Sequence, residues 1–173
     1  MEYMFLPLKR YAEFSGRSRR MEYWMFFLFQ FIVGIVFQVL VMTTVGGAAA
    51  FGARPSSMMA AGGVMMVLFG LYALFALAML IPNIAVGVRR LHDTDRTGWW
   101  LLAPFGPYLL TFVFFGMALG GNSSIAGMLA MISMLAAIGL AITLLVFMFL
   151  DGTKGPNKYG PDPKGRVDAA VFA

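Results

Sequence analysis

The stretch VMMVLFGLYALFALAMLIPNIAVGV, residues 64–88, decides the fold class, because it carries no charged side chain over its whole length. A helix needs about 20 apolar residues to cross the hydrocarbon core of a bilayer. Two more stretches without charge, 23–53 and 97–150, lie on either side of it. Lipid offers no hydrogen-bond partner to an unpaired backbone N–H or C=O group, so only helices and closed barrels span membranes. The period-two alternation of apolar and polar residues that marks a barrel strand is absent. The sequence therefore predicts transmembrane helices.

The composition excludes several classes of protein. Hydrophobic residues make up 60% of the chain and charged residues 12%, whereas soluble domains have about 45–50% and about 25%. A soluble enzyme, a disordered tail and a secreted disulfide scaffold are excluded. Because the chain has no cysteine, thiolate nucleophiles, iron–sulfur clusters and cysteine-based zinc sites are excluded too.

The charge-free stretch 97–150 is too long for one helix, and turn-forming residues at 120–124 divide it. We therefore predict an all-α, integral membrane four-helix bundle. The expected organisation is a cytoplasmic or interfacial amino-terminal segment, 1–22, a four-helix transmembrane domain, 23–150, and a turn-rich cytoplasmic tail, 151–173. The four spans are expected near residues 23–45, 64–88, 99–119 and 125–150.

The placement of basic residues predicts the orientation of these spans. All Lys and Arg residues except Arg54 lie before the first span, between the second and third, or after the fourth. Basic residues near helix ends favour the cytoplasmic side, so both termini are expected in the cytoplasm. The net charge of +5 then follows from membrane topology, and we expect no nucleic-acid partner.

Proline breaks two of the predicted spans. Pro82 removes the helical hydrogen bond to the carbonyl of Ala78, and Pro104 and Pro107 free two carbonyls in the third span. Two interpretations are open. Neighbouring helices can satisfy the freed carbonyls at ordinary kinks, or the breaks line a shallow cytoplasmic vestibule with Asn83 on its polar stripe.

Small residues follow one face of the fourth predicted span, at Ala126, Ala130, Ser133, Ala137 and Ala141. Their spacing places them in one helical stripe, which lets a neighbouring backbone approach closely. The stripe indicates packing within the chain or, as an alternative, a homodimer.

Three polar motifs stand outside the spans. The first, FSGRSRRMEYW at 14–24, carries arginines that either hold an anionic ligand or anchor the first helix at the membrane. Ser15 or Ser18 is expected to cap this helix, and Glu22 to pair with Arg19.

The second motif, RRLHDTDRTGWW at 89–100, is the densest polar run. If the second helix continues through it, Arg89, Asp93 and Arg96 share a face and pair with one another. His92, the single histidine, is a candidate acid–base group with Asp93, or a structural hydrogen-bond donor. One histidine beside two close carboxylates makes a poor metal site, so we expect no metal and no cofactor.

The third motif, DGTKGPNKYGPDP at 151–163, specifies successive turns. We expect an ordered loop folded under the bundle, which brings Asp151 and Asn157 toward the arginines. A flexible tail is the alternative, and it is the expectation beyond Gly165.

Taken together and in this order, the three motifs resemble the bacterial inner-membrane family called domain of unknown function eight hundred and five. The residues that carry the resemblance are Phe14-Ser15-Gly16-Arg17, Arg20, Glu22-Tyr23-Trp24, Arg89-Arg90-Leu91-His92-Asp93, Gly98-Trp99-Trp100, Gly152-Thr153, Gly155, Asn157 and Tyr159-Gly160-Pro161-Asp162-Pro163. The resemblance spans about 11–163. It implies a small multi-pass protein of the bacterial inner (plasma) membrane with no established activity. This chain has Asp95-Arg96-Thr97 where such proteins often look more like Gly-Arg-Ser.

Three functions are compatible with these motifs. The first is a non-enzymatic membrane protein whose cytoplasmic face binds an anionic lipid headgroup, a small ligand or a protein partner, with a homo-oligomer or a membrane-protein partner as open alternatives. The second is a small transporter or channel subunit, supported by Gln30, Gln38, Asn83 and the proline breaks, although no ionisable residue lies within the spans. The third is a membrane-embedded enzyme that uses His92 and Asp93. The candidate ligand-binding residues are Arg17, Arg19, Arg20, Glu22, Asn83, Arg89, Arg90, His92, Asp93, Asp151 and Asn157.

Overall fold

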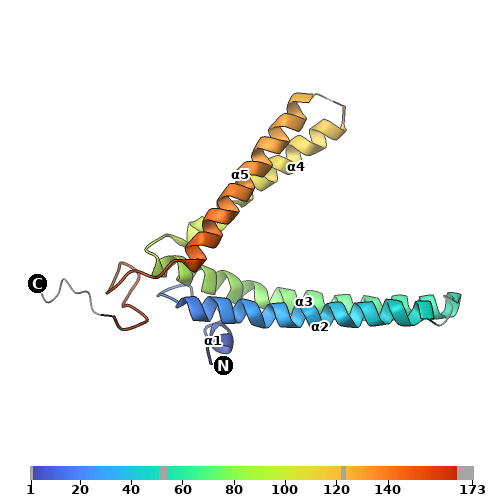
Figure 1. Ribbon diagram of the computed structural model, residues 1–173, viewed down its shortest axis with the longest axis horizontal. Helices are drawn as coiled ribbons and strands as arrows, with labels where there is room; N and C mark the ends of the chain where they lie inside the picture. The colour runs from blue at the N-terminus through green and yellow to red at the C-terminus, as the bar shows by residue number, and fades with distance from the viewer. Residues whose placement is uncertain (1, 51–53, 122–123, 167–173) are drawn as a thin grey trace, which may run out of the picture. The chain divides into compact units, whose positions relative to one another are not determined.

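The computed structural model describes residues 2–50, 54–121 and 124–166, and in these residues the chain forms helices and loops without a strand (Figure 1). The elements in chain order are α1 (Glu2–Lys9), α2 (Arg20–Ala50), α3 (Pro55–Asp93), the 3₁₀ helix η1 (Gly98–Leu102), α4 (Phe105–Leu119) and α5 (Ser124–Phe149). Four segments, α2, α3, η1 with α4, and α5, are long and apolar enough to cross a membrane. The predicted all-helical membrane class is therefore confirmed.

The helix bounds differ from the predicted ones in two ways. Both α2 and α3 extend beyond 23–45 and 64–88 at each end. The third predicted span is divided into η1 and α4, and Pro104 is the residue that caps α4. A proline fits the start of a helix, whereas in the interior it removes one helical hydrogen bond. The turn predicted at 120–124 begins at Gly120, and its residues 122–123 lie outside the described part.

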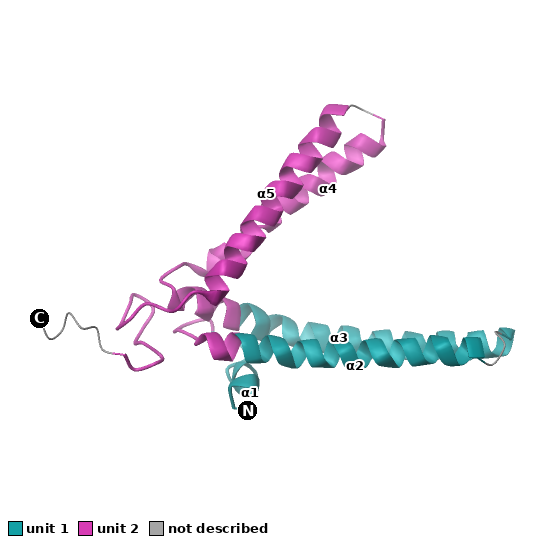
Figure 2. Cartoon of the chain, in the orientation of Figure 1, with its two compact units in different colours: residues 1–13, 24–85 teal, residues 14–23, 86–173 magenta. Residues whose placement is uncertain are grey.

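Two compact units make up the chain (Figure 2). Unit 1 comprises residues 1–13 and 24–85, and unit 2 comprises residues 14–23 and 86–173. In unit 1, aromatic side chains join α2 to α3. The Phe37 ring stacks on Tyr72, with ring centroids 4.3 Å apart, and meets Phe69 edge-on at 5.3 Å. Such pairs add to the packing of two helices beyond the area they bury.

Polar groups inside unit 1 are bound to each other. The amides of Gln30 and Asn83 exchange two hydrogen bonds, each 2.8 Å long. The helix α3 continues through Pro82, and the Tyr11 hydroxyl donates a hydrogen bond of 2.6 Å to the carbonyl of Ala78. This is the carbonyl that Pro82 leaves without a helical partner. Of the two interpretations of Pro82, the structure favours an ordinary break whose carbonyl is satisfied within the protein.

In unit 2, α4 and α5 lie side by side (Figure 1). The buried residues on α5 include four of the five small residues of the predicted stripe, namely Ala126, Ala130, Ser133 and Ala137. The Thr111 hydroxyl of α4 lies 3.1 Å from that of Ser133. Packing of this stripe within the chain is therefore confirmed for these four positions, because small side chains allow the two backbones to approach.

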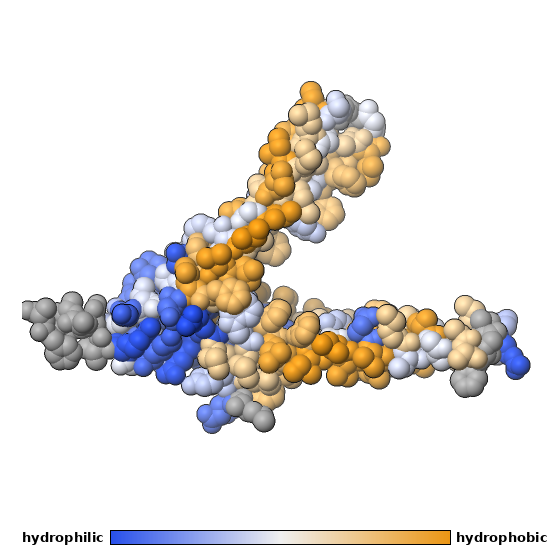
Figure 3. All heavy atoms as spheres, in the orientation of Figure 1, coloured by the Kyte–Doolittle hydropathy of each residue, from blue (hydrophilic) through white to orange (hydrophobic). Residues whose placement is uncertain are grey.

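The 3₁₀ helix η1 is fixed to the last turns of α5. The Trp100 ring meets Phe147 edge-on, with centroids 5.2 Å apart, and the Arg96 guanidinium lies 3.9 Å from the centre of the Phe147 ring. Figure 3 shows hydrophobic residues over α4 and α5 and hydrophilic residues gathered over the loops of unit 2. The polar motifs are therefore concentrated at one end of this helix pair.

Candidate functional site

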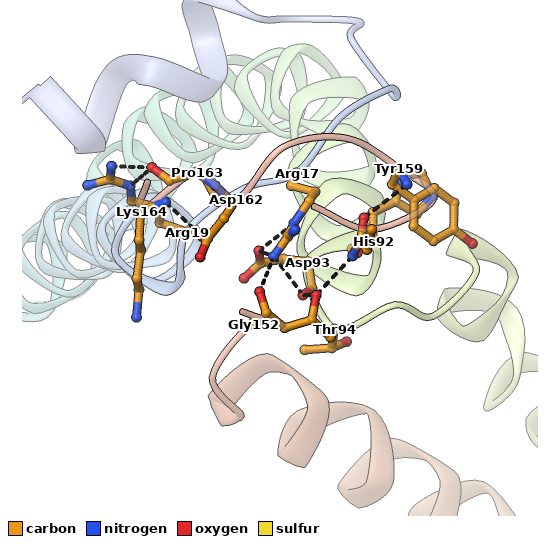
Figure 4. A network of polar contacts seen from close by, with 12 residues as sticks. Arg17, Arg19, His92, Asp93, Thr94, Gly152, Tyr159, Asp162, Pro163 and Lys164 are labelled. Atoms are coloured by element: carbon orange, nitrogen blue, oxygen red, sulfur yellow. Dashed lines mark hydrogen bonds and ion pairs between the residues drawn. The ribbon is translucent and has the colours of Figure 1, made fainter. Parts of the chain in front are cut away.

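The three polar motifs meet in unit 2, at the end of α3 (Figure 4). We call this assembly the motif cluster. It consists of residues 17–22 from the first motif, 89–94 from the second, and the tail loop, residues 151–166, from the third. Its buried polar residues are Arg17, Ser18, Glu22, Arg89, Arg90, Asp93 and Thr94. Charged groups are buried in proteins when they are paired and hydrogen-bonded, so the contacts of each decide what it can do.

Arg17 joins the tail loop to the end of α3. Its Nε donates to Asp93 Oδ1 at 2.9 Å. Its Nη2 and Nη1 donate to the carbonyls of Thr153 and Gly155, at 2.6 and 2.8 Å. A guanidinium offers five N–H donors in a fixed fork, and here the fork is directed at the protein's own oxygen atoms.

Asp93 is the last residue of α3 and binds two arginines at once. Arg17 donates to Oδ1 at 2.9 Å, and Arg90 Nη1 donates to Oδ2 at 2.7 Å. The backbone N–H of Thr153 donates to the Asp93 carbonyl at 2.9 Å. A Cβ atom at position 152 would overlap the Asp93 carboxylate, so only glycine fits there without a shift. Asp93 is thus the centre of the motif cluster.

Two arginines bind the carbonyls at the end of α5. Arg90 Nε donates to the Met148 carbonyl at 3.3 Å, and Arg90 Nη2 donates to that of Leu150. Arg20 Nη1 donates to the Phe149 carbonyl at 3.1 Å. The last carbonyls of a helix lack helical partners and carry partial negative charge. Arginines from the starts and ends of other helices therefore cap α5.

Glu22 pairs with Arg89, a partner from a distant segment that the predicted local pairing with Arg19 did not include. The Arg89 Nη2 to Glu22 Oε1 distance is 3.0 Å, and both side chains are buried. Arg19 instead donates from Nε to the Pro163 carbonyl of the tail loop, at 2.7 Å. The predicted cap at Ser18 is wrong, since its buried hydroxyl has no hydrogen-bond partner among the described residues. The prediction considered only neighbours in sequence, whereas distant segments supply the partners.

The prediction that Arg96 shares a helix face with Arg89 and Asp93 depended on a helix that continues through residue 96, and for Arg96 it is wrong. The helix α3 ends at Asp93, and Asp95 has a left-handed backbone conformation with a φ of 59°. The chain therefore leaves the helix before Arg96, whose Nη1 donates to the Thr94 carbonyl at 3.1 Å.

His92 holds the first and third motifs together. Its ring stacks on Tyr159, with centroids 3.8 Å apart and an angle of 3° between the planes. Its Nδ1 lies 3.2 Å from the carbonyl of Gly16, which accepts only, so Nδ1 carries the proton. Asn157 Nδ2 donates to the His92 carbonyl at 2.9 Å. The acid–base pair of His92 with Asp93 is not assembled in the described residues, because the Asp93 carboxylate binds Arg17 and Arg90.

The tail loop is ordered, as predicted, and its turn at residues 157–160 is closed by its own hydrogen bonds. Asn157 and Gly160 exchange backbone hydrogen bonds of 3.0 Å, and Asn157 Oδ1 accepts from the Tyr159 N–H at 2.9 Å. The predicted flexible tail beyond Gly165 lies largely in residues 167–173, outside the described residues.

A second group of charges, at the surface of unit 2, surrounds Asp151. Arg20 Nη2 lies 2.9 Å and Lys164 Nζ 2.7 Å from the same oxygen, Asp151 Oδ1. The side chains of Arg20 and Asp151 are 42% and 55% exposed. The hydrogen bond from Lys164, with the positive charge of Arg20 nearby, lowers the pKa of Asp151.

Asp162 and Arg166 form the last pair of the tail loop, with 2.8 Å between Oδ2 and Nε. Burial alone would raise the pKa of Asp162. The hydrogen bonds from Arg166 and from the backbone N–H of Lys164 outweigh this and lower its pKa to about 2. The same hydrogen bond raises the pKa of Arg166.

Ten of the eleven predicted site residues lie in unit 2 within this assembly, and Asn83 lies in unit 1 with Gln30. The sequence prediction missed Gly152, Thr153, Tyr159, Asp162, Lys164 and Arg166 as members. The signal available was the third motif itself, which was predicted to fold toward the arginines, but only Asp151 and Asn157 of it were assigned to the site. Within the described residues, no group of three His, Asp or Glu side chains is placed to hold a metal ion.

Four apolar segments of membrane length, together with a buried ion-paired cluster in unit 2 at the end of α3, define a multi-pass helical membrane protein. Residues 11–161 match the family described as Protein of unknown function (DUF805), and the chain belongs to this family.

Two relatives cover almost the whole chain. Inner membrane protein YhaI of Escherichia coli (strain K12) is 34% identical over 164 residues, which are 95% of this chain and 97% of YhaI. Inner membrane protein YhaH of the same strain is 32% identical over 168 residues, 95% of this chain and 98% of YhaH. No solved structure matches the chain. The relatives are thus inner membrane proteins of a family without an assigned function.

Proposed function

We propose that this chain is a non-enzymatic protein of the bacterial inner membrane, with both termini in the cytoplasm, whose motif-cluster face binds the headgroups of anionic phospholipids. One observation carries the proposal, namely the excess of basic groups that reach the surface of unit 2. Among the described residues of unit 2, the basic residues that are at least partly exposed are Arg19, Arg20, Arg96, Lys154, Lys158, Lys164 and Arg166, and the acidic residues with exposed side chains are Asp95 and Asp151. Near a membrane each such cation attracts anionic lipid by about 1 kcal/mol.

The proposal divides the predicted ligand-binding arginines into two groups. Arg17, Arg89 and Arg90 are buried and bind Asp93, Glu22 and backbone carbonyls. Separating one of these arginines from its carboxylate would leave a buried charge unpaired, which costs several kcal/mol. We propose that the buried arginines stabilise the fold and that the exposed cations bind the lipid headgroups.

The other two functions receive less support from the contacts. The amides of Gln30 and Asn83 bind each other, so they do not favour a transport pathway. His92 donates to a backbone carbonyl and Asp93 binds two arginines, so neither is placed for acid–base catalysis. The exposed basic residues can bind lipid headgroups without a transport pathway and without acid–base catalysis.

The proposal is tested by placing the purified protein in nanodiscs that contain equal amounts of phosphatidylcholine and phosphatidylglycerol. Native mass spectrometry after release then counts the lipids of each kind that remain bound. We expect phosphatidylglycerol to be retained in clear excess at low salt, and the excess to shrink as salt rises, because salt screens exposed charges. Equal retention of the two lipids at low salt would refute the proposed function.

A further inference from the structure

The exposed charged groups around Asp151 form a site that comprises only a few residues of the basic surface of unit 2. Arg20 and Lys164 come from segments far apart in the sequence, yet both place a cationic nitrogen within 3 Å of a single oxygen, Asp151 Oδ1, at 2.9 and 2.7 Å. The two cations are therefore held within the reach of one small anion. Exposed lysines such as Lys154 lack this arrangement, since Lys154 has no charged partner among the described residues.

We propose that the phosphodiester of an anionic phospholipid binds between Arg20 and Lys164, and that Asp151 is an internal competitor which occupies this position in the absence of lipid. The inference rests on the proposed function and names the site where it operates. A phosphate oxygen makes the same charge-assisted hydrogen bonds to guanidinium and ammonium groups as a carboxylate oxygen does. The ligand can therefore replace Asp151 without any new donor from the protein.

The position of this site along α5 matches the level of lipid headgroups. Arg20 Nη1 donates to the carbonyl of Phe149, the last residue of α5, at 3.1 Å. Asp151 follows two residues later, after a helix of high hydropathy that is long enough to span a bilayer. The end of such a helix lies at the boundary between hydrocarbon and headgroups. Arg20 is thus anchored to α5 at the level where a phospholipid phosphate lies.

The pairs that surround the site do not depend on Asp151. Arg166 binds Asp162 at 2.8 Å, and Arg90 binds Asp93 at 2.7 Å. Release of Asp151 from Arg20 and Lys164 leaves these buried or part-buried pairs intact. Because the Asp151 side chain is 55% exposed, its carboxylate can turn into water when a phosphate takes its place.

The experiment compares four proteins in nanodiscs of phosphatidylcholine and phosphatidylglycerol, with retained phosphatidylglycerol as the readout. In Arg20→Gln/Lys164→Gln we expect retention to fall by about tenfold. In the matched control Lys154→Gln/Lys158→Gln, which removes the same charge from the same unit, we expect a change of less than about twofold. In Asp151→Asn, which removes the competitor, we expect retention to rise by about two- to fivefold.

Three other outcomes would overturn the site, the proposed function or the competitor role of Asp151. Equal losses in the two double variants would overturn the site but leave the proposed function, because binding would then be spread over the basic surface. Loss of the preference for phosphatidylglycerol in the wild-type protein would overturn both. Unchanged or lower retention in Asp151→Asn would overturn the competitor role.

Two further arms exclude misfolding and free phosphate as explanations. Arg20→Lys/Lys164→Arg keeps both charges, so its retention should stay within about twofold of the wild-type value, and a large loss would overturn the site. Inorganic phosphate is titrated against the protein in discs of phosphatidylcholine alone. Phosphate binding that disappears in Arg20→Gln/Lys164→Gln would overturn the lipid as ligand, because the site would then recognise the free anion.

Discussion

Asp95 adopts a left-handed backbone conformation, with a φ of 59°, directly after α3 ends. Glycine adopts this conformation without steric cost, whereas other L-residues are strained there. The left-handed conformation at position 95 gives a physical reason for the Gly-Arg-Ser pattern that proteins of this family often show where this chain has Asp95-Arg96-Thr97. The exposed ion pair of Asp95 with Lys158, at 3.7 Å, compensates little of that strain.

Asp95→Gly is therefore expected to stabilise the protein by about 0.5–1 kcal/mol. The measurement is the free energy of unfolding in detergent, followed by tryptophan fluorescence. Asp95→Val, which places a β-branched residue in the same conformation, should destabilise the protein. A lower stability of Asp95→Gly than of the wild type would contradict the account of this turn.

Gly152 lies directly against the Asp93 carboxylate, and any Cβ atom there would overlap it. Gly152→Ala must displace either Asp93 or the tail loop, and we expect a loss of about 2 kcal/mol or more in the free energy of unfolding. Gly116→Ala is the matched control, because a Cβ at position 116 in α4 meets no atom within 4 Å. That control should be neutral or slightly stabilising. Equal effects of the two substitutions would show that the tail loop does not pack on Asp93.

Asp162 makes the stability of the tail loop depend on pH. Its pKa of about 2 in the folded protein lies below the ordinary value of about 3.9. The contribution is therefore fully present above about pH 4 and is lost as the pH falls from there to about 2. We expect it to be about 1 kcal/mol after allowance for solvent screening.

The check is the difference in unfolding free energy between wild type and Asp162→Asn, measured at several pH values. The difference should be constant above about pH 5 and shrink toward pH 2. A difference that grows as the pH falls would mean that the folded state raises this pKa.

At the scale of elements, the long helices could be predicted because a long apolar segment in lipid must satisfy its own backbone hydrogen bonds, and without the alternation of a barrel strand it does so as a helix. The small-residue stripe from Ala126 to Ala137 also identified the face of α5 that is buried. Two short elements escaped prediction. The helix α1 has only eight residues and contains Pro7, and η1 was included in the third span because nothing before Pro104 interrupts its apolar run.

The ends of α3 and α5 depend on Asp93, which neutralises Arg17 and Arg90 at 2.9 and 2.7 Å. Asp93→Asn leaves two buried guanidiniums without their counter-charge, and we expect it to destabilise the protein by about 3–5 kcal/mol. Asp95→Asn makes the same chemical change two residues away at an exposed position, and its effect should be within about 0.5 kcal/mol. Thermal unfolding in detergent compares the two. A small effect of Asp93→Asn would refute the central place of this carboxylate.

At the scale of the whole molecule, the sequence identified ten residues of the site and the approach of Asp151 to the arginines, but not the partners of the buried charges. The prediction paired Glu22 with Arg19 and Asp93 with Arg89 and Arg96, because only neighbours along one helix can be inferred from spacing. The structure pairs Glu22 with Arg89 and Asp93 with Arg17, across sequence separations of 67 and 76 residues. Such contacts follow from how the motifs fold onto one another, which spacing alone does not determine.

Both lipid proposals depend on the claim that the motif cluster lies on the cytoplasmic side of the inner membrane. The chain has no cysteine, so single cysteines can report sidedness with a maleimide that does not cross membranes. We predict that Ser56→Cys, next to the start of α3, is labelled in intact spheroplasts. We predict that Lys154→Cys, in the tail loop, is labelled only after the spheroplasts are permeabilised. Labelling of Lys154→Cys in intact cells, with Ser56→Cys protected, would contradict the account.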